Sequence, residues 1–204
     1  MSASARENIL KKIRMALEHP TPLPFPESNA TEPVVQPLQQ DIVVEFAEQF
    51  TQLGGKFSFC ENMQELAVQL NHLFDQREWK NIYCTETVWK NLLQHDAFSD
   101  DIVNCDAAIT SCETLIARTG SVVVSARNSG RIPSVYTPVH ICIAKASQLV
   151  YDIKDALLQL EKYGDNLPSQ ISLATGPSRT ADIEKTLVVG VHGPKEVYCF
   201  IVED

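Results

Sequence analysis

The sequence predicts an α/β fold in which a mostly parallel sheet is covered by helices on both faces. Short apolar runs, which are typical of buried strands, alternate along the chain with longer segments whose apolar residues recur at helical spacing. Such alternation builds β-α-β units, whose crossover helices pack on the two faces of a parallel sheet. A length of 204 residues, with 44% hydrophobic and 21% charged residues, is sufficient for one substantial globular core.

The first 37 residues differ in composition from the rest of the chain. Ile9, Ile13 and Leu17 lie four residues apart and predict a helix. Residues 19–37 contain six prolines, which exclude a helix or a central strand, so this stretch is expected to be an extended arm. We therefore divide the chain into an N-terminal helix with a proline-rich arm, residues 1–37, and a single α/β domain, residues 38–204.

The first half of the domain alternates helices and strands. Residues 41–53 carry apolar side chains on one stripe that ends at two glycines, which predicts a helix. A strand is expected over 56–60. Asn62 and Glu65 stand at the spacing of a capping box before a second helix. A strand over 81–84 and a short helix over 85–93 follow.

The second half contains more strands. Residues 115–118 and 121–125 read as two β segments on either side of a tight Thr-Gly turn. Next come a strand over 139–144 and a helix over 150–163, which a glycine ends. We expect strands 171–175 and 197–202 to complete the sheet.

Composition excludes several classes of protein. A net charge of −9 argues against a general nucleic-acid binder, and no apolar run approaches the roughly 20 residues of a membrane span. The N-terminus has no apolar core of a secretory signal. The six cysteines form no Cys-x-x-Cys pair, which favours ordinary buried thiols in a reducing, cytoplasmic compartment. The five histidines form no zinc motif, so no metal site is predicted.

Residues 176–184, with the sequence Gly-Pro-Ser-Arg-Thr-Ala-Asp-Ile-Glu, carry more chemistry than a turn requires. They combine a bend with two hydroxyls, a guanidinium and two carboxylates. They also follow the strand predicted over 171–175, and in open α/β folds ligands bind at the carboxyl ends of strands. This segment is therefore our first candidate for a ligand site.

Two interpretations of this segment stay open. If Ser178 or Thr180 caps a following helix, the free N–H groups of that helix and the guanidinium of Arg179 would form an anion site. Asp182 and Glu184 would then orient Arg179 or accept a hydroxyl of the ligand. The alternative is a capped turn in which Arg179 only pairs with Asp182.

A second loop and two separate residues, Arg131 and His140, add further candidates. Residues 190–194, Gly-Val-His-Gly-Pro, place His192 between glycines, which allow a ligand to approach the backbone. The alternative is an exposed loop histidine. Arg131 lies in a polar stretch where apolar packing does not explain it. His140 begins a strand, where a lone histidine is more often structural than a ligand-binding residue.

Several segments together resemble the LUD-domain family, in its lactate-utilisation protein C-like form. The resemblance runs from about residue 106 to 202. It is carried by residues 115–121, Arg131, residues 138–141, and above all by the two glycine-containing segments at 176–184 and 190–194.

The resemblance implies a three-layer α/β/α fold similar to ribose-5-phosphate isomerase and CoA transferases. It also implies a role with iron–sulfur partner proteins in oxidising L-lactate to pyruvate, with the clusters on the partners and no cofactor bound by this chain. One position departs from the family pattern. Arg118 stands where many members have an acidic residue, and in the related CoA transferases a glutamate is the nucleophile. A guanidinium cannot attack an acyl group, which weakens a transferase function.

We therefore expect a cytoplasmic accessory subunit that binds a small carboxylate or phosphate in a lactate-utilisation system. The alternatives are an independent enzyme acting on sugar phosphates or acyl-CoA thioesters, and an interaction module that docks through residues 1–37. The oligomeric state stays open. His192 and His140 are the catalytic candidates, and the candidate ligand-binding residues are Arg118, Arg131, Gly176, Ser178, Arg179, Thr180, Asp182, Glu184, Gly190, His192 and Gly193.

Overall fold

The computed structural model of the protein describes residues 5–18, 37–127, 129–181 and 187–204. The chain divides into two units, Met1–Pro37 and Leu38–Asp204. In the first unit the predicted helix is confirmed as α1 (Ala5–Leu17), which has no buried residue. The proline-rich arm predicted after it lies outside the described residues.

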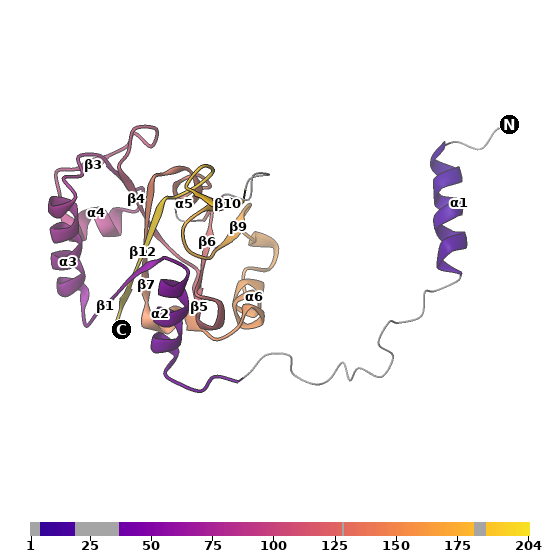
Figure 1. Cartoon of the computed structure of the whole chain (residues 1–204), viewed down its shortest axis with the longest axis horizontal. Helices are drawn as coiled ribbons and strands as arrows, with labels where there is room; N and C mark the ends of the chain where they lie inside the picture. Colours follow the sequence, from indigo (N-terminus) through magenta and orange to yellow (C-terminus); the bar gives the residue numbers. More distant parts are fainter. Residues whose placement is uncertain (1–4, 19–36, 128, 182–186) are drawn as a thin grey trace. The chain divides into compact units, whose positions relative to one another are not determined.

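A six-stranded parallel sheet forms the centre of the second unit (Figure 1). Its strand order is β1-β12-β7-β4-β2-β3, and every neighbouring pair is parallel. The predicted α/β class with a mostly parallel sheet is therefore confirmed. The strands are β1 (Lys56–Cys60), β2 (Ile82–Tyr83), β3 (Phe98–Ser99), β4 (Ala107–Ser111), β7 (Val139–Lys145) and β12 (Glu196–Val202).

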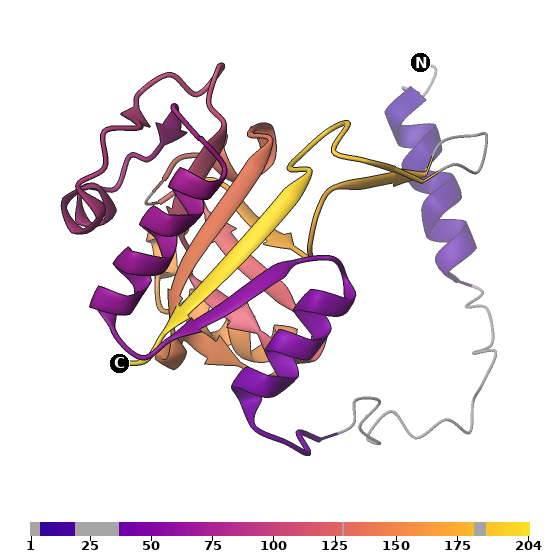
Figure 2. The ribbon, with the colours of Figure 1, turned by 60° about the vertical axis from the view of Figure 1, so that its left-hand side comes forward.

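Helices cover both faces of this sheet. Successive residues of a strand point to opposite faces, so neighbouring residues of β7 pack against different helices. Ile141 and Ile143 of β7 pack with α3 (Met63–Gln76) and α4 (Thr87–Leu93) in one core cluster. Cys142 packs in another cluster with Phe46 and Phe50 of α2 (Ile42–Gln52). Figure 2 shows α3 and α2 on either side of the edge strand β1. The predicted cap at Asn62 is confirmed, since its side chain accepts a backbone hydrogen bond at the start of α3. Asp41, for which no cap was predicted, does the same at the start of α2.

A second sheet packs over the face that carries α2. Its order is β8-β5-β6-β9, with β5 (Thr114–Ile116), β6 (Ser121–Ser125), β8 (Leu149–Val150) and β9 (Ile171–Ala174). Leu115, Val122 and Val124 face the cluster shared with α2. Ile116 and Val123 face α6 (Ile153–Glu161) on the other side. The predicted tight turn is the 3₁₀ segment η1 (Ala117–Thr119) followed by Gly120.

Three expectations need correction. The strand expected to complete the main sheet at 171–175 instead pairs antiparallel with β6. Three of its residues are partly buried and Leu173 is exposed, as suits an edge strand, whereas β7 and β12 are buried almost throughout. The helix expected from residue 150 begins at Ile153, because Leu149 and Val150 pair with β5.

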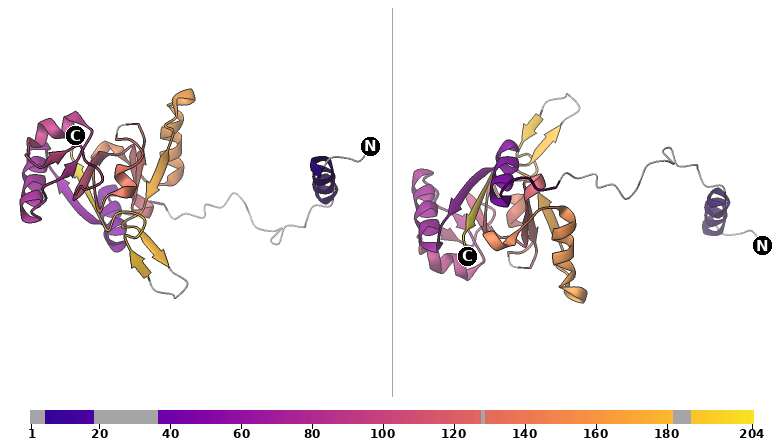
Figure 3. Two further views of the ribbon diagram at one scale, coloured as in Figure 1. Left: turned by 90° about the horizontal axis from the view of Figure 1, so that it is seen from above. Right: turned by 90° about the horizontal axis from the view of Figure 1, so that it is seen from below.

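The third correction concerns the segment after Ser178, where no helix begins. β10 (Arg179–Ala181) pairs antiparallel with β11 (Leu187–Val189) in a hairpin that projects from the rest of this unit in both views of Figure 3. The remaining short segments are α5 (Pro133–Tyr136), η2 (Ala146–Gln148) and η3 (Gly164–Asn166). Among the described helices, none is long and apolar enough to cross a membrane.

Candidate functional site

The two glycine-containing segments meet in space. The backbone N–H of Ser178 donates to the carbonyl of Pro194 at 2.9 Å, and the N–H of Gly190 donates to the carbonyl of Ser178 at 2.9 Å. Gly193 approaches so closely that an added Cβ would lie 2.8 Å from Cβ of Ser178. A side chain at position 193 would therefore push the loops apart. The loop is also tied to the start of β7, because the N–H of Lys195 donates to the carbonyl of Pro138 at 2.8 Å.

The two loops enclose one side of a cavity of about 270 Å³, which we call the intersheet cavity. Residues 172–175 of β9 and its end contribute one wall, and His140 of β7 and Val197 of β12 contribute another. The cavity thus lies between the two sheets. The structure brings five of the sequence-predicted residues together in its lining: His140, Gly176, Ser178, His192 and Gly193.

The position of the intersheet cavity differs from the expected one. His140 and Val197 are register partners and each is the second residue of its strand, so the cavity lies at the amino ends of β7 and β12. The sequence predicted a site at the carboxyl end of the parallel sheet. Among the described strands, only β9 meets the cavity with its carboxyl end; it belongs to the second sheet and ends where the parallel strands of the first sheet begin.

His140 is the most unusual group of the lining. It is completely buried, and its Nε2 lies 2.8 Å from the hydroxyl of Thr110. Its Nδ1 is buried and has no hydrogen-bond partner within the described part of the chain. Burial lowers the pKa of His140 to about 4, so the ring is neutral at pH 7. A buried nitrogen without a partner costs about 1–3 kcal/mol.

Four hydroxyls complete the polar part of the lining: Ser134, Ser172, Thr175 and Ser178. Only Ser178 was predicted. Thr175 directly precedes the Gly-Pro bend and Ser134 follows Arg131 by three residues, so their proximity to the candidate segments was the available signal. Among the described residues of the lining there is no Arg, Lys, Asp or Glu. The cavity therefore offers hydrogen bonds from hydroxyls and imidazoles rather than fixed charges.

The three candidate arginines lie outside this lining, each with a partner of its own. The Nε of Arg118 donates to Asp152, the cap of α6, at 2.6 Å, and this contact lowers the pKa of the Asp152 carboxyl. Arg131 donates to the hydroxyl of Ser169 at 3.2 Å. Arg179 donates to the carbonyl of Leu53, where the negative end of the α2 dipole also favours a cation.

The remaining candidates are distributed around the cavity. Thr180 lies in β10. Asp182 and Glu184 lie outside the described residues. Gly190 and His192 line a neighbouring hollow of about 430 Å³, to which Lys195 contributes a cation. In the described segments, no group of three or more His, Cys, Asp or Glu side chains is arranged to hold a metal ion.

Arg179 gives a first testable expectation. Arg179→Gln removes one charge-assisted hydrogen bond from an exposed contact, so we expect the melting temperature to fall by only about 2 °C. Differential scanning calorimetry measures this change. Lys154→Gln, which removes an exposed cation from α6, is the matched control and should leave the melting temperature unchanged. A decrease above about 10 °C for Arg179→Gln would contradict a purely local contact.

Fold and site together define an α/β domain with a small cavity between a parallel sheet and a second, mixed sheet. Hydroxyls and two histidines line this cavity among apolar side chains. The chain belongs to the LUD domain family, whose model matches residues 43–202. The match covers almost all of the second structural unit and includes both glycine-containing segments.

Comparisons with individual proteins agree with this family. Two proteins named lactate utilization protein C, from Bacillus licheniformis and Halalkalibacterium halodurans, are each 39% identical to this chain, over 100 and 103 residues. The matches cover 47% and 48% of this chain but 42% and 45% of those proteins, so the chain spans less than half of their length. The crystal structure of a DUF162 family protein from Deinococcus radiodurans has a similar fold, with a TM-score of 0.60 at 17% identity. That similarity covers 79% of this chain and 96% of the other.

Proposed function

We propose that this chain is a cytoplasmic accessory subunit of a lactate-utilisation system and that its intersheet cavity binds a small carboxylate. The name shared by relatives at 39% identity supports the process. The meeting of both family-specific loops with His140 in one cavity is the observation that carries the site.

The chemistry of the cavity suits a small hydroxylated acid better than a phosphate. Hydroxyl groups donate hydrogen bonds to carboxylate oxygens and accept one from an alcohol, as in lactate. The buried Nδ1 of His140 would gain a partner, and His192 at the exposed side can donate to a carboxylate. Phosphate sites normally add Arg or Lys, which the described lining does not contain. The alternative of an enzyme for sugar phosphates therefore gains no support from this lining.

The redox step is assigned to partner proteins in this proposal. Oxidation of lactate to pyruvate releases two electrons and two protons, and hydroxyl and imidazole side chains cannot accept electrons. We therefore propose that iron–sulfur clusters on partner proteins take the electrons, whereas this chain positions the acid. A cytoplasmic location suits its six cysteines, which are all free thiols and buried.

A genetic and biochemical experiment tests the proposed process. A strain that lacks this chain should fail to grow on L-lactate and grow normally on glucose, and the full chain should restore growth. Affinity-tagged full chain should co-purify with proteins that contain iron and acid-labile sulfide. Normal growth on L-lactate together with no such partners would refute the proposal, and turnover of phosphosugars or acyl-CoA esters by the purified chain would support the alternative.

Binding of L-lactate tests the site itself. His140→Gln and His192→Gln should each weaken binding about tenfold, which corresponds to the loss of one good hydrogen bond. Titration calorimetry or two-dimensional NMR measures the change. His95→Gln is the control, because His95 lies beside Asp75 and Phe74 on the opposite face of the parallel sheet. Equal affinity in all three variants would place the ligand elsewhere.

A further inference from the structure

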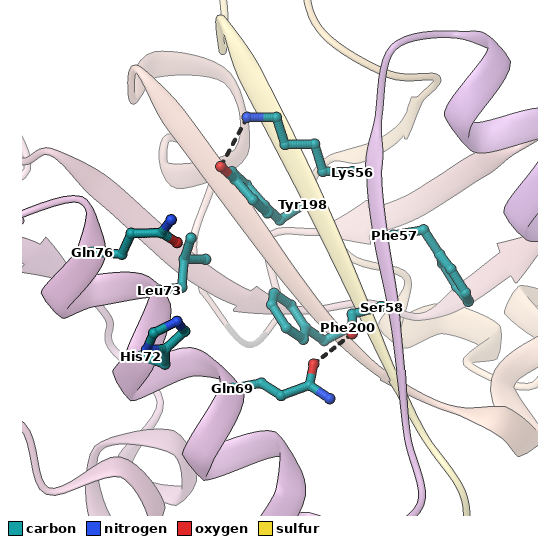
Figure 4. A pocket seen from close by; sticks show the side chains of 9 residues that line it. All are labelled: Lys56, Phe57, Ser58, Gln69, His72, Leu73, Gln76, Tyr198 and Phe200. Atoms are coloured by element: carbon teal, nitrogen blue, oxygen red, sulfur yellow. Dashed lines mark hydrogen bonds between the residues drawn. The ribbon is translucent and has the colours of Figure 1, made fainter.

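A second cavity, of about 280 Å³, lies on the opposite face of the six-stranded sheet, against α3. We call it the α3 cavity. Figure 4 shows Gln69, His72, Leu73 and Gln76 of α3 facing side chains of β1 and β12 across it. These lining residues lie outside the glycine-containing segments, so the cavity is separate from the site described above.

Lys56 is the only residue with a permanent charge in the described lining of the α3 cavity. Its ammonium contacts Glu196 and donates to the hydroxyl of Tyr198 at 3.0 Å. Burial opposes the charge on Lys56, but the hydrogen bonds to Glu196 and Tyr198 outweigh it and raise the pKa of the lysine. The ammonium is therefore fully charged at pH 7.

The carboxylate of Glu196 does not balance this charge, because it is shared. Arg77 approaches Glu196 with both terminal nitrogens, at 2.6 and 3.4 Å, and also donates to Tyr198 at 2.6 Å. Burial raises the pKa of Glu196, but hydrogen bonds from Lys56 and Arg77 outweigh it and lower the pKa, so this carboxyl stays ionised. Two cations and one carboxylate leave a net charge of about +1 at this end of the cavity.

The other part of the α3 cavity is apolar. Leu73 projects from α3 toward Phe200 of β12, and the ring of Tyr198 lies between Phe200 and Lys56 (Figure 4). At the far end the hydroxyl of Ser58 donates to Gln69 at 2.5 Å. A small hollow with an apolar floor and one cation at its edge has the composition of a binding site for a small molecule.

We infer that the α3 cavity binds an organic monocarboxylate with a small apolar body, whose carboxylate pairs with Lys56 while the body lies on Leu73 and Phe200. The pairing satisfies the excess positive charge. The apolar contact covers the part of Leu73 that is still exposed to water, whereas Phe200 is already buried and forms the floor. Because Lys56 is itself 45% exposed in its side chain, the ion pair adds only modest affinity.

Phenylacetate and the uncharged phenylacetamide are matched probes for this site, used with the full chain. Binding is followed by the change in the NMR chemical shifts of the His72 imidazole as the probe is added. Phenylacetamide should bind about fivefold more weakly than phenylacetate, and Lys56→Gln should weaken phenylacetate about fivefold, as expected for an exposed ion pair. Glu196→Gln should strengthen phenylacetate binding about threefold, because it removes a competing anion. Lys154→Gln, on α6, is the control that keeps the same change in net charge away from the cavity.

Opposite responses of Lys56→Gln and Glu196→Gln would support the proposal, because a loss of packing alone would weaken binding in both. Three results would overturn it: equal affinity for the acid and the amide, an unchanged affinity in Lys56→Gln, or titration shifts that do not include His72. Inorganic phosphate is a further probe. If it displaces phenylacetate at equal concentration, the cavity selects an anion without the apolar body, and the inference is wrong.

Discussion

Gly120→Ala is expected to lower the free energy of unfolding by about 3–5 kcal/mol. Gly120 follows η1 with a φ of +58°, which alone costs a residue with a Cβ about 1–2 kcal/mol. In addition, the new Cβ would lie 2.6 Å from the backbone nitrogen of Phe50 and 2.7 Å from the carbonyl carbon of Gln49. Both are backbone atoms of α2, which cannot move without disturbing the core around Phe46 and Phe50.

Gly164→Ala separates the two causes. Gly164 has a similar φ of +51°, but an added Cβ there would meet nothing within 4 Å. Its substitution should therefore cost only the backbone part, about 1–2 kcal/mol. Urea denaturation followed by circular dichroism measures both variants. Equal losses of stability in the two variants would show that a Cβ at position 120 does not clash with the backbone of α2.

Acid should destabilise the protein through His140 by about 3 kcal/mol between pH 7 and pH 4. In the unfolded chain the pKa of this histidine is 6.5, and burial lowers it to about 4 in the folded protein. Between these values the unfolded state binds a proton that the folded state does not. The contribution of His140 to stability is therefore complete above pH 6.5 and is lost as the pH falls toward 4.

His140→Gln isolates this effect from the carboxyl groups that also titrate in acid. Urea denaturation at several pH values should show a steeper loss for the wild type than for the variant, and the difference should develop between pH 6.5 and 4. If the stability of the wild type and of the variant fell equally with pH, the ring of His140 would be accessible to protons in the folded protein. A bound acid that donates to or accepts from Nδ1 should also shift this window, which links the measurement to the proposed site.

Much of the fold was predictable because local signals and tertiary environment agree. The run Val139–Lys145 is apolar at nearly every position, and it forms a central strand buried on both faces. Asn62 with Glu65 predicted the start of α3, and the cap is present. The second sheet was not predicted. Ile171–Ala174 has the same β pattern as a strand of the main sheet, and no local feature decides which free edge it joins.

The candidate site was predictable only in part. The two glycine-containing segments stand out in sequence, and their glycines permit the close approach at Gly193 and Ser178. The three arginines also stand out, but their partners lie far away in the chain: Asp152 for Arg118, Ser169 for Arg131 and the carbonyl of Leu53 for Arg179. The sequence shows that an arginine is present, whereas only the tertiary structure shows which group it contacts.

The place of β12 in the sheet constrains how the domain is made on the ribosome. β12 follows β1 and β7 in sequence, yet it lies between them and joins them, with Tyr198 opposite Lys56 and Val197 opposite His140. Until Glu196–Val202 has emerged from the exit tunnel, β1 has no neighbour and β7 presents an open edge. The nascent chain must keep these apolar strands from pairing elsewhere, and final closure depends on contacts that span most of the domain. Such a chain is expected to depend on chaperones during synthesis.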